Sequence, residues 1–200
     1  FVEHNGDLVA VGFFDRSGVN TGFSNIGAWN GTLWSPVGQV DAEVLGVASY
    51  RGELFIAGGL VNYGNIARYD GFGGYFATTF GTDDAGYALT VYDDHLIAGG
   101  IFTLAGGVLT GPVAKWNYDN ETWSELSPTQ TTFPPPPADP PFVTGWANVV
   151  TVIDGELYAG GNWIDINGDA SLRNFVRFNA ATQTWVRVGP ALTGPDFEVW

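Results

Sequence analysis

A short apolar run that ends at glycine recurs four times in this chain, and this repetition constrains the fold more than any other feature. The runs occupy residues 8–14, 54–60, 96–102 and 157–163, and three of them contain a Gly-Gly pair where the first has Val11-Gly12. Such a run is typical of a buried strand that stops where the backbone needs room or a positive φ. The sequence therefore predicts a repeat protein.

Two further features follow each run in the same order. An aromatic segment begins 18, 12, 17 and 18 residues after the leading leucine, at residues 26–30, 66–70, 113–117 and 175–179. A second aromatic residue stands a few positions later in each unit: Trp34, Phe76, Trp123 and Trp185. Turn-forming residues separate these features, so each unit predicts short antiparallel strands joined by tight turns.

The dipeptides just before the four runs predict type I′ hairpin turns: Asn5-Gly6, Arg51-Gly52, Asp93-Asp94 and Asp154-Gly155. Two charged positions also recur. The position before the leading leucine is acidic at Asp7, Glu53 and Glu156, and one position of the aromatic segment is basic at Arg68, Lys115 and Arg177. Because three of the seven basic side chains share one repeat position, we expect a cross-strand ion pair in each sheet. The first unit lacks the cation, since Ala28 replaces it.

The units resemble Kelch-type β-propeller repeats. The resemblance rests on Gly-Gly after an apolar strand and on an aromatic residue beside Asp or Asn with a tryptophan soon after, as in residues 116–123. Residues 65–71 are similar to repeats of large secreted or surface bacterial proteins. The resemblance implies an all-β propeller with four Kelch-like blades, each a four-stranded antiparallel sheet.

This fold covers residues 1–200 as a single domain or segment, with units at about 1–43, 44–84, 85–143 and 144–200. A Pro-rich insertion at 129–141 explains the long third unit. The first two units depart most from the pattern, and we expect them to be the least regular. Residues 197–200 resemble the start of another strand, which either closes a four-bladed ring or belongs to a larger propeller or array.

Composition limits the possible partners. The net charge is −14, from 21 acidic and 7 basic side chains, which argues against nucleic acid and against anionic membrane surfaces as partners. No apolar run approaches 18 residues, so no membrane insertion is predicted. Cysteine is absent, which excludes disulfides, thiolate metal sites and a cysteine nucleophile from this stretch, including the Tyr-Cys crosslink of Kelch-based copper oxidases.

Three groups of residues are candidate sites. Trp163 stands apart from the repeated tryptophans, in a loop position that suits stacking on a sugar ring. Asp165, Asn167 and Asp169 alternate as calcium ligands do, although Ala170 and Val176 break the EF-hand pattern, so an Asx-rich turn is the alternative. Asn30 and Asn120 begin N-glycosylation sequons in the same turn of two units, where they also serve as turn formers.

The sequence offers little material for catalysis, since His4 and His95 are the only histidines and no carboxylate pair is singled out. The resemblance implies a non-catalytic, extracellular or cell-surface module with a structural or adhesive role in a bacterial assembly. It requires no cofactor, although calcium is possible, and its partners are other protein chains or further copies of itself, with glycans as a further possibility. The alternative is a carbohydrate-binding module or a glycoside hydrolase that uses the propeller loops.

Overall fold

The protein is described here by a computed structural model that covers residues 1–18, 20–40, 42–133 and 145–189. Its described part is all-β and contains four antiparallel sheets of four strands each, which confirms that part of the sequence prediction. Sheet 1 contains β1 (Val2–His4), β2 (Asp7–Val11), β5 (Ile26–Trp29) and β6 (Trp34–Pro36). Sheet 2 contains β7 (Val44–Tyr50), β8 (Glu53–Gly58), β9 (Ile66–Tyr69) and β10 (Tyr75–Ala77).

Sheet 3 contains β11 (Gly86–Tyr92), β12 (His95–Gly100), β15 (Val113–Asn117) and β16 (Thr122–Glu125). Sheet 4 contains β17 (Trp146–Ile153), β18 (Glu156–Asn162), β19 (Phe175–Asn179) and β20 (Thr184–Arg187). Two small hairpins, β3 (Arg16–Ser17) with β4 (Asn20–Thr21) and β13 (Leu104–Ala105) with β14 (Val108–Leu109), extend from sheets 1 and 3. A 3-10 turn, η1 (Val61–Tyr63), follows β8.

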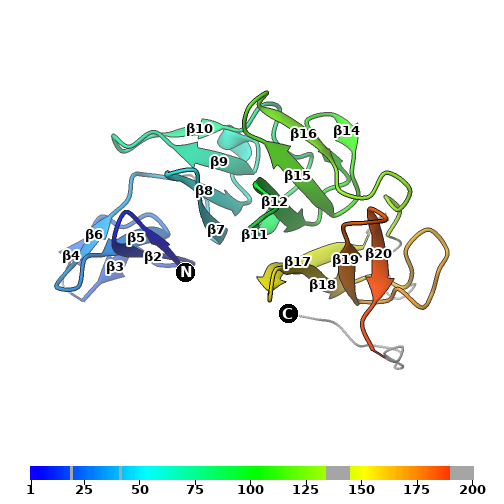
Figure 1. Ribbon diagram of the computed structural model, residues 1–200. Helices are drawn as coiled ribbons and strands as arrows, with labels where there is room; N and C mark the ends of the chain where they lie inside the picture. The colour runs from blue at the N-terminus through cyan, green and yellow to red at the C-terminus, as the bar shows by residue number, and fades with distance from the viewer. Residues whose placement is uncertain (19, 41, 134–144, 190–200) are drawn as a thin grey trace.

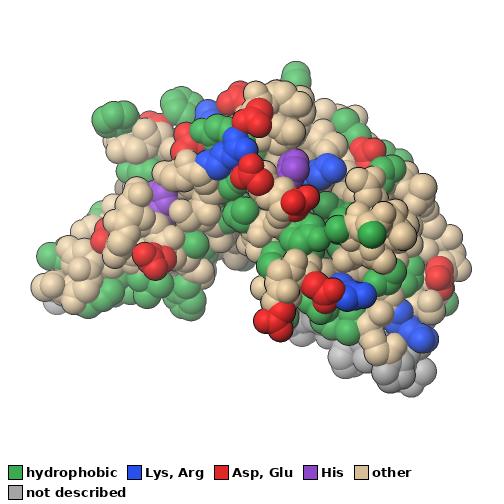
Figure 2. All heavy atoms as spheres, in the orientation of Figure 1, with side chains coloured by type: hydrophobic (Ala, Val, Ile, Leu, Met, Phe, Trp, Pro, Cys, Tyr) green, Lys and Arg blue, Asp and Glu red, His purple; other side chains and the backbone are tan. Residues whose placement is uncertain are grey.

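The four sheets lie along an arc in chain order (Figure 1). Each sheet is a simple meander in which successive long strands pair. Along the inside of the arc, the first strand of sheet 3, β11, contacts the first strands of its neighbours, β7 of sheet 2 and β17 of sheet 4. The described residues of sheets 1 and 4 form the two ends of the arc and are separated by open space (Figures 1 and 2).

The hydrophobic core lies between successive sheets. Because strand side chains alternate, each sheet has two faces. The front face packs on the preceding sheet, as Leu96 and Trp116 of sheet 3 do against Phe55 and Ile66 of sheet 2. The back face packs on the following sheet, and the same arrangement recurs between sheets 1 and 2 and between sheets 3 and 4. Burial of apolar area between sheets is therefore the main force that holds the arc together.

An aromatic pair marks the front face of every sheet. The pairs are Trp29–Trp34, Tyr69–Tyr75, Trp116–Trp123 and Phe178–Trp185, with ring centroids 5.7, 5.2, 5.3 and 5.4 Å apart. The strand register corrects the sequence prediction for the second unit: Tyr75 lies opposite Tyr69 and is buried, whereas Phe76 points to solvent. The prediction chose the neighbouring residue. Because adjacent side chains of a strand point to opposite faces of the sheet, this shift of one residue exchanged the buried and the exposed position.

The repeated glycine serves close approach between strands. Gly58, Gly100 and Gly161 each follow the leading leucine by four positions, and a Cβ atom there would lie less than 3.0 Å from a backbone oxygen at the start of the first strand of the sheet. That first strand has a register shift at this point in sheets 2, 3 and 4, as a β-bulge produces. The sequence suggested two reasons for these glycines, a positive φ or a close approach of the backbone. None of the three has a positive φ, so the close approach is the reason.

The four predicted hairpin turns have the expected backbone conformation. Both turn residues have a positive φ in every copy, for example 53° at Asn5 and 87° at Gly6, or 49° at Asp93 and 54° at Asp94. A type I′ turn requires this combination, so the prediction is confirmed.

The predicted cross-strand ion pairs form in sheets 2 and 4. Arg68 Nη1 lies 3.4 Å from Glu53 Oε2, and Arg177 contacts Glu156. In sheet 3 the acidic position holds His95, and no ion pair of Lys115 is found within the described residues. Arg68 also reaches Glu121 of sheet 3 at 3.4 Å, so one of these cations links two sheets.

We expect Arg177→Ala to lower the free energy of unfolding by about 1 kcal/mol or less, because both partners are partly exposed and water screens their attraction. Denaturant unfolding with a matched Glu156→Gln variant measures this cost. A loss of several kcal/mol in either variant would contradict the assignment of the pair to the surface.

Candidate functional site: a cleft between the first two sheets

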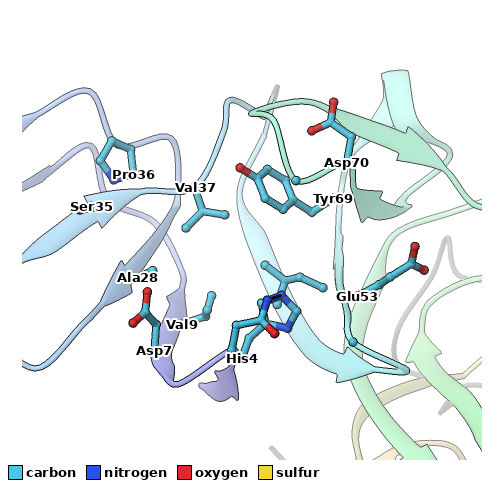
Figure 3. Close-up of a pocket in the computed structure, with 14 residues that line it drawn as sticks. His4, Asp7, Val9, Ala28, Ser35, Pro36, Val37, Glu53, Tyr69 and Asp70 are labelled. Atoms are coloured by element: carbon cyan, nitrogen blue, oxygen red, sulfur yellow. Dashed lines mark hydrogen bonds between the residues drawn. The ribbon is translucent and has the colours of Figure 1, made fainter.

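A cleft of about 500 Å³ lies between sheets 1 and 2. Residues from both sheets line it, including His4 and Asp7 from sheet 1 and Glu53, Tyr69 and Asp70 from sheet 2 (Figure 3). Figure 3 shows the ring of Tyr69 directed across the cleft toward Val37. The volume lies within the range of ordinary small-molecule sites.

The junction between sheets 2 and 3 shows how the same position is filled elsewhere. There Arg51 binds Asp94 and donates to Asp119 across 2.6 Å. Its guanidinium carbon also lies 5.6 Å from the ring centre of Tyr50 and 5.1 Å from that of Tyr118. These contacts combine charge-assisted hydrogen bonds with cation–π attraction and bridge the outer part of that junction.

Smaller residues at the equivalent positions open the junction between sheets 1 and 2. The first junction has Asn5 in the position of Arg51, Gly52 in the position of Asp94, and Gly71 in the position of Tyr118. The cleft therefore arises from three local differences between repeats. A comparison of the repeat positions in the sequence could have found it, because side-chain volume is lost at all three.

Most polar groups of the cleft are engaged by the chain itself. Asp70 Oδ1 accepts hydrogen bonds from the backbone N–H groups of Phe72 and Gly74, at 2.7 and 2.9 Å. These bonds stabilise the carboxylate and hold the pKa of Asp70 below its ordinary value. Glu53 contacts Arg68, and Figure 3 shows the carboxylates of Glu53 and Asp70 turned away from the centre of the cleft. This arrangement can hold a small polar ligand between Tyr69 and the first sheet.

The two histidines take part in hydrogen bonds near turns. His4 Nδ1 lies 2.9 Å from Ser49 Oγ, which joins sheet 1 to sheet 2, and its Nε2 lies 3.0 Å from Asn5 Nδ2. His95 Nδ1 donates to the carbonyl oxygen of Asp93 across 2.6 Å. Within the described ranges, no three His, Cys, Asp or Glu side chains are placed to hold a metal ion.

The ion pair at the second junction predicts a pH effect. The hydrogen bond from Arg51 lowers the pKa of Asp94 below 3.8. A carboxyl whose folded pKa is depressed stabilises the protein above its unfolded pKa, and this contribution is lost as the pH falls through the folded value. We therefore expect the melting temperature to fall below about pH 4, and to fall less steeply in Asp94→Asn. Equal slopes in the two proteins would contradict this role of Asp94.

Trp163, the predicted sugar-stacking residue, lies in the core. It is 0% exposed, its Nε1 donates to the carbonyl oxygen of Leu172 across 2.7 Å, and its ring packs edge-on against Phe133 at 5.3 Å. No ring face is left for a ligand. The position after Gly-Gly is a packing position, since Phe102 of sheet 3 is also 0% exposed, whereas Phe14 of sheet 1 is only partly buried.

The predicted calcium loop is tied together by its own hydrogen bonds. Asp165 Oδ1 accepts from Gly168 N across 2.6 Å, Asp169 Oδ1 accepts from Ser171 N across 2.9 Å, and Asn167 Oδ1 accepts from Thr132 N across 2.9 Å. The hydrogen bonds from Ser171 lower the pKa of Asp169. These contacts match the Asx-rich turn that the sequence left as the alternative. They also attach the loop to Thr132, in the first part of the Pro-rich insertion, whose residues 134–141 lie outside the described part.

We expect a chelator to leave the melting temperature unchanged, because the loop oxygens already accept hydrogen bonds from the chain. A thermal melt with and without EDTA, repeated after addition of excess calcium, measures this. A stabilisation by calcium that disappears in Asp165→Asn would contradict the assignment.

The two sequon asparagines lie in exposed turns. Asn30 Oδ1 accepts from the N–H groups of Thr32 and Leu33, at 3.0 Å each, and Asn120 Oδ1 accepts from Thr122 Oγ1 across 2.6 Å. Both side chains are exposed, so glycan attachment remains a prediction that rests on the sequons. The remaining sequence-predicted feature at residues 197–200 lies outside the described residues.

A comparison with known protein families finds no family model that matches this chain, and a search of curated proteins finds no matching sequence. In the described ranges, no helix is long and apolar enough to cross a membrane.

Proposed function

We propose that the four sheets are consecutive blades of a Kelch-like β-propeller and that the chain is a non-catalytic structural or adhesive module of an extracellular or cell-surface bacterial assembly. The observation that carries the proposal is that the repeated positions of the units are packing positions. The leading leucine, the glycine and the aromatic pair all serve contact between strands or between sheets. A chain of this kind forms a scaffold of packed sheets, and its surface residues are the ones that can bind partners.

Two properties support the extracellular part of the proposal. The strongly acidic composition keeps a repeat protein soluble and separate from anionic surfaces. Both sequon asparagines are accessible, as glycan attachment in an exported protein requires. We infer that the partners are protein chains, with the exposed faces and turns as contact surfaces.

A display experiment tests this function. We expect non-adherent bacteria that present the chain on their surface to aggregate or to attach to a protein-coated surface, while the purified chain shows no turnover of a panel of glycoside and ester substrates. An unrelated propeller displayed at the same density is the control. Absence of adhesion by the displayed chain would contradict the proposed role.

The cleft between sheets 1 and 2 favours a second candidate, a carbohydrate-binding function at a site different from Trp163. It combines a volume of about 500 Å³ with the ring of Tyr69 and the carboxylate of Asp7. Ser35 of β6 lines the cleft, so Ser35→Tyr places a larger side chain there and narrows the cleft. Loss of glycan-array binding in this variant would support the carbohydrate-binding function. Unchanged binding would show that the cleft is not the binding site.

A further inference from the structure

The front face of sheet 1 has no described sheet packed on it. Its leading leucine, Leu8, is 43% exposed. The equivalent leucines of the other sheets are 1% exposed at Leu54 and 0% exposed at Leu96 and Leu157. An apolar side chain that is buried in three copies and exposed in the fourth indicates a packing face without its partner.

The aromatic pair of sheet 1 shows the same difference. Trp29 and Trp34 keep the paired geometry, but both rings are partly exposed. The corresponding final-strand residues, Trp123 and Trp185, are buried against the preceding sheet. The front face of sheet 1, defined by Leu8, Trp29 and Trp34, is therefore preformed and open.

The back face of sheet 4 is open in the complementary way. Tyr158 and Phe175 stack with ring centres 5.8 Å apart and an angle of 16° between the rings, and both are partly exposed. Their equivalents in sheet 2, Phe55 and Ile66, are fully buried against sheet 3. Ile153, at the end of β17 on the same face, is 52% exposed. Tyr158, Phe175 and Ile153 define this second open face.

The two open faces are the two halves of the interface that already joins the sheets within the chain. Every internal junction pairs the back face of one sheet with the front face of the next. The contact rests on apolar side chains and not on charge: Arg177 at the rim of the back face is paired with Glu156, and the exposed Glu3, opposite Leu8, carries the front face's negative charge. Within one chain the faces lie at opposite ends of the arc (Figures 1 and 2).

We propose that a second copy of this chain docks the front face of its sheet 1 on the back face of sheet 4. The contact continues the internal interface, so it is head-to-tail. Repeated head-to-tail contacts close into a ring when the rotation per copy allows it and otherwise grow into an open filament. This inference deepens the proposed function by naming the partner, and it rests on that proposal's account of the sheets as consecutive blades.

The experiment uses two variants that each block one face. Leu8→Lys places a charge on the front face and leaves the back face intact, whereas Ile153→Glu blocks the back face and leaves the front face intact. We expect the wild-type chain to associate with rising concentration in analytical ultracentrifugation. Each variant alone loses this association. An equimolar mixture of the two forms a dimer of twice the mass of the chain and nothing larger, because only one productive contact remains.

Two controls distinguish a specific head-to-tail contact from nonspecific apolar association and from loss of folding. Phe72→Lys replaces an apolar side chain that is 96% exposed in the turn between β9 and β10, outside both faces, and it should leave association unchanged. The melting temperatures of the variants report folding, and Leu8→Ala provides a milder change, which should weaken association without adding charge. If Leu8→Lys abolished dimers and Ile153→Glu did not, the contact would be front-to-front and the proposal would be wrong.

A wild-type chain that stays monomeric at every concentration would also overturn the proposal and leave the faces to another occupant, such as a further repeat of the same kind. That result differs from a failure of the proposed function. Adhesion of displayed cells together with a monomeric chain removes only the head-to-tail contact. Head-to-tail association without adhesion removes only the adhesive role.

Discussion

Trp163→Ala is expected to lower the free energy of unfolding by about 3–5 kcal/mol, the range for removing a large aromatic side chain from a core. The side chain is 0% exposed and packs on Phe133, and its indole N–H is satisfied by the carbonyl oxygen of Leu172. The substitution leaves a cavity and an unpaired carbonyl oxygen, and both destabilise the fold. Urea unfolding followed by circular dichroism measures the change.

A conservative variant separates these two contributions. Trp163→Phe keeps most of the ring volume and loses the hydrogen bond to Leu172, so we expect a smaller loss than in Trp163→Ala. A loss in Trp163→Ala no larger than that of an ordinary surface substitution, about 0.5 kcal/mol, would show that the ring is accessible and would make Trp163 a ligand-binding candidate again.

Gly58→Ala is expected to cost about 1–3 kcal/mol or more, because overpacking forces the backbone to move. An added Cβ would lie less than 3.0 Å from the carbonyl oxygen of Glu43, a backbone atom that cannot rotate away. The adjacent Gly59 is a matched control, since a Cβ there meets no atom within 4 Å and its φ is not positive. Gly59→Ala should be neutral or slightly stabilising, because alanine restricts the unfolded chain more than glycine does.

The comparison of these two neighbouring substitutions tests the role assigned to the Gly-Gly pair. Chemical unfolding of both variants under the same conditions gives the difference directly. Equal effects at Gly58 and Gly59 would contradict the account in which one glycine of the pair allows the first strand of the sheet to approach and bulge.

The sequence predicted the local elements of this fold well because each one has a short-range signal. The hairpin at Asn5-Gly6 and its copies depend on two adjacent residues that tolerate positive φ. The pairing of Arg177 with Glu156 followed from two positions that recur together. The all-β class and the four antiparallel sheets followed from the repeat as a whole.

The errors came from features that depend on register and on distant contacts. Phe76 and Tyr75 are neighbours of similar type, and only the pairing of β10 with β9 decides which of them is buried. Trp163 does follow the end of β18, as predicted, but it was expected to be accessible, and it is buried because its partners, Phe133 and Leu172, are set by the fold and not by the repeat. The cleft between sheets 1 and 2 could not be found from the residues that the four units have in common, because it arises at positions where the side chains of the units differ in size.

The four sheets form an open arc in which sheets 1 and 4 lie apart (Figure 1). The chain has no cysteine, so spin labels can be placed at Thr32→Cys and Asp154→Cys without interference, and both positions are exposed. Dilution of the labelled chain with excess unlabelled chain restricts the electron–electron distance measurement to one molecule. We predict a long distance between the labels, as the separation of sheets 1 and 4 in Figure 1 requires.

A closed ring predicts a short distance between the two labels. In a closed ring of four sheets, the turn that holds Thr32 would approach the turn that holds Asp154 as the turn at Asp119 approaches Arg51 between sheets 2 and 3. A short distance within one molecule would therefore show that sheet 4 packs on sheet 1 of the same chain, and it would contradict both the open arc and the head-to-tail contact that depends on it.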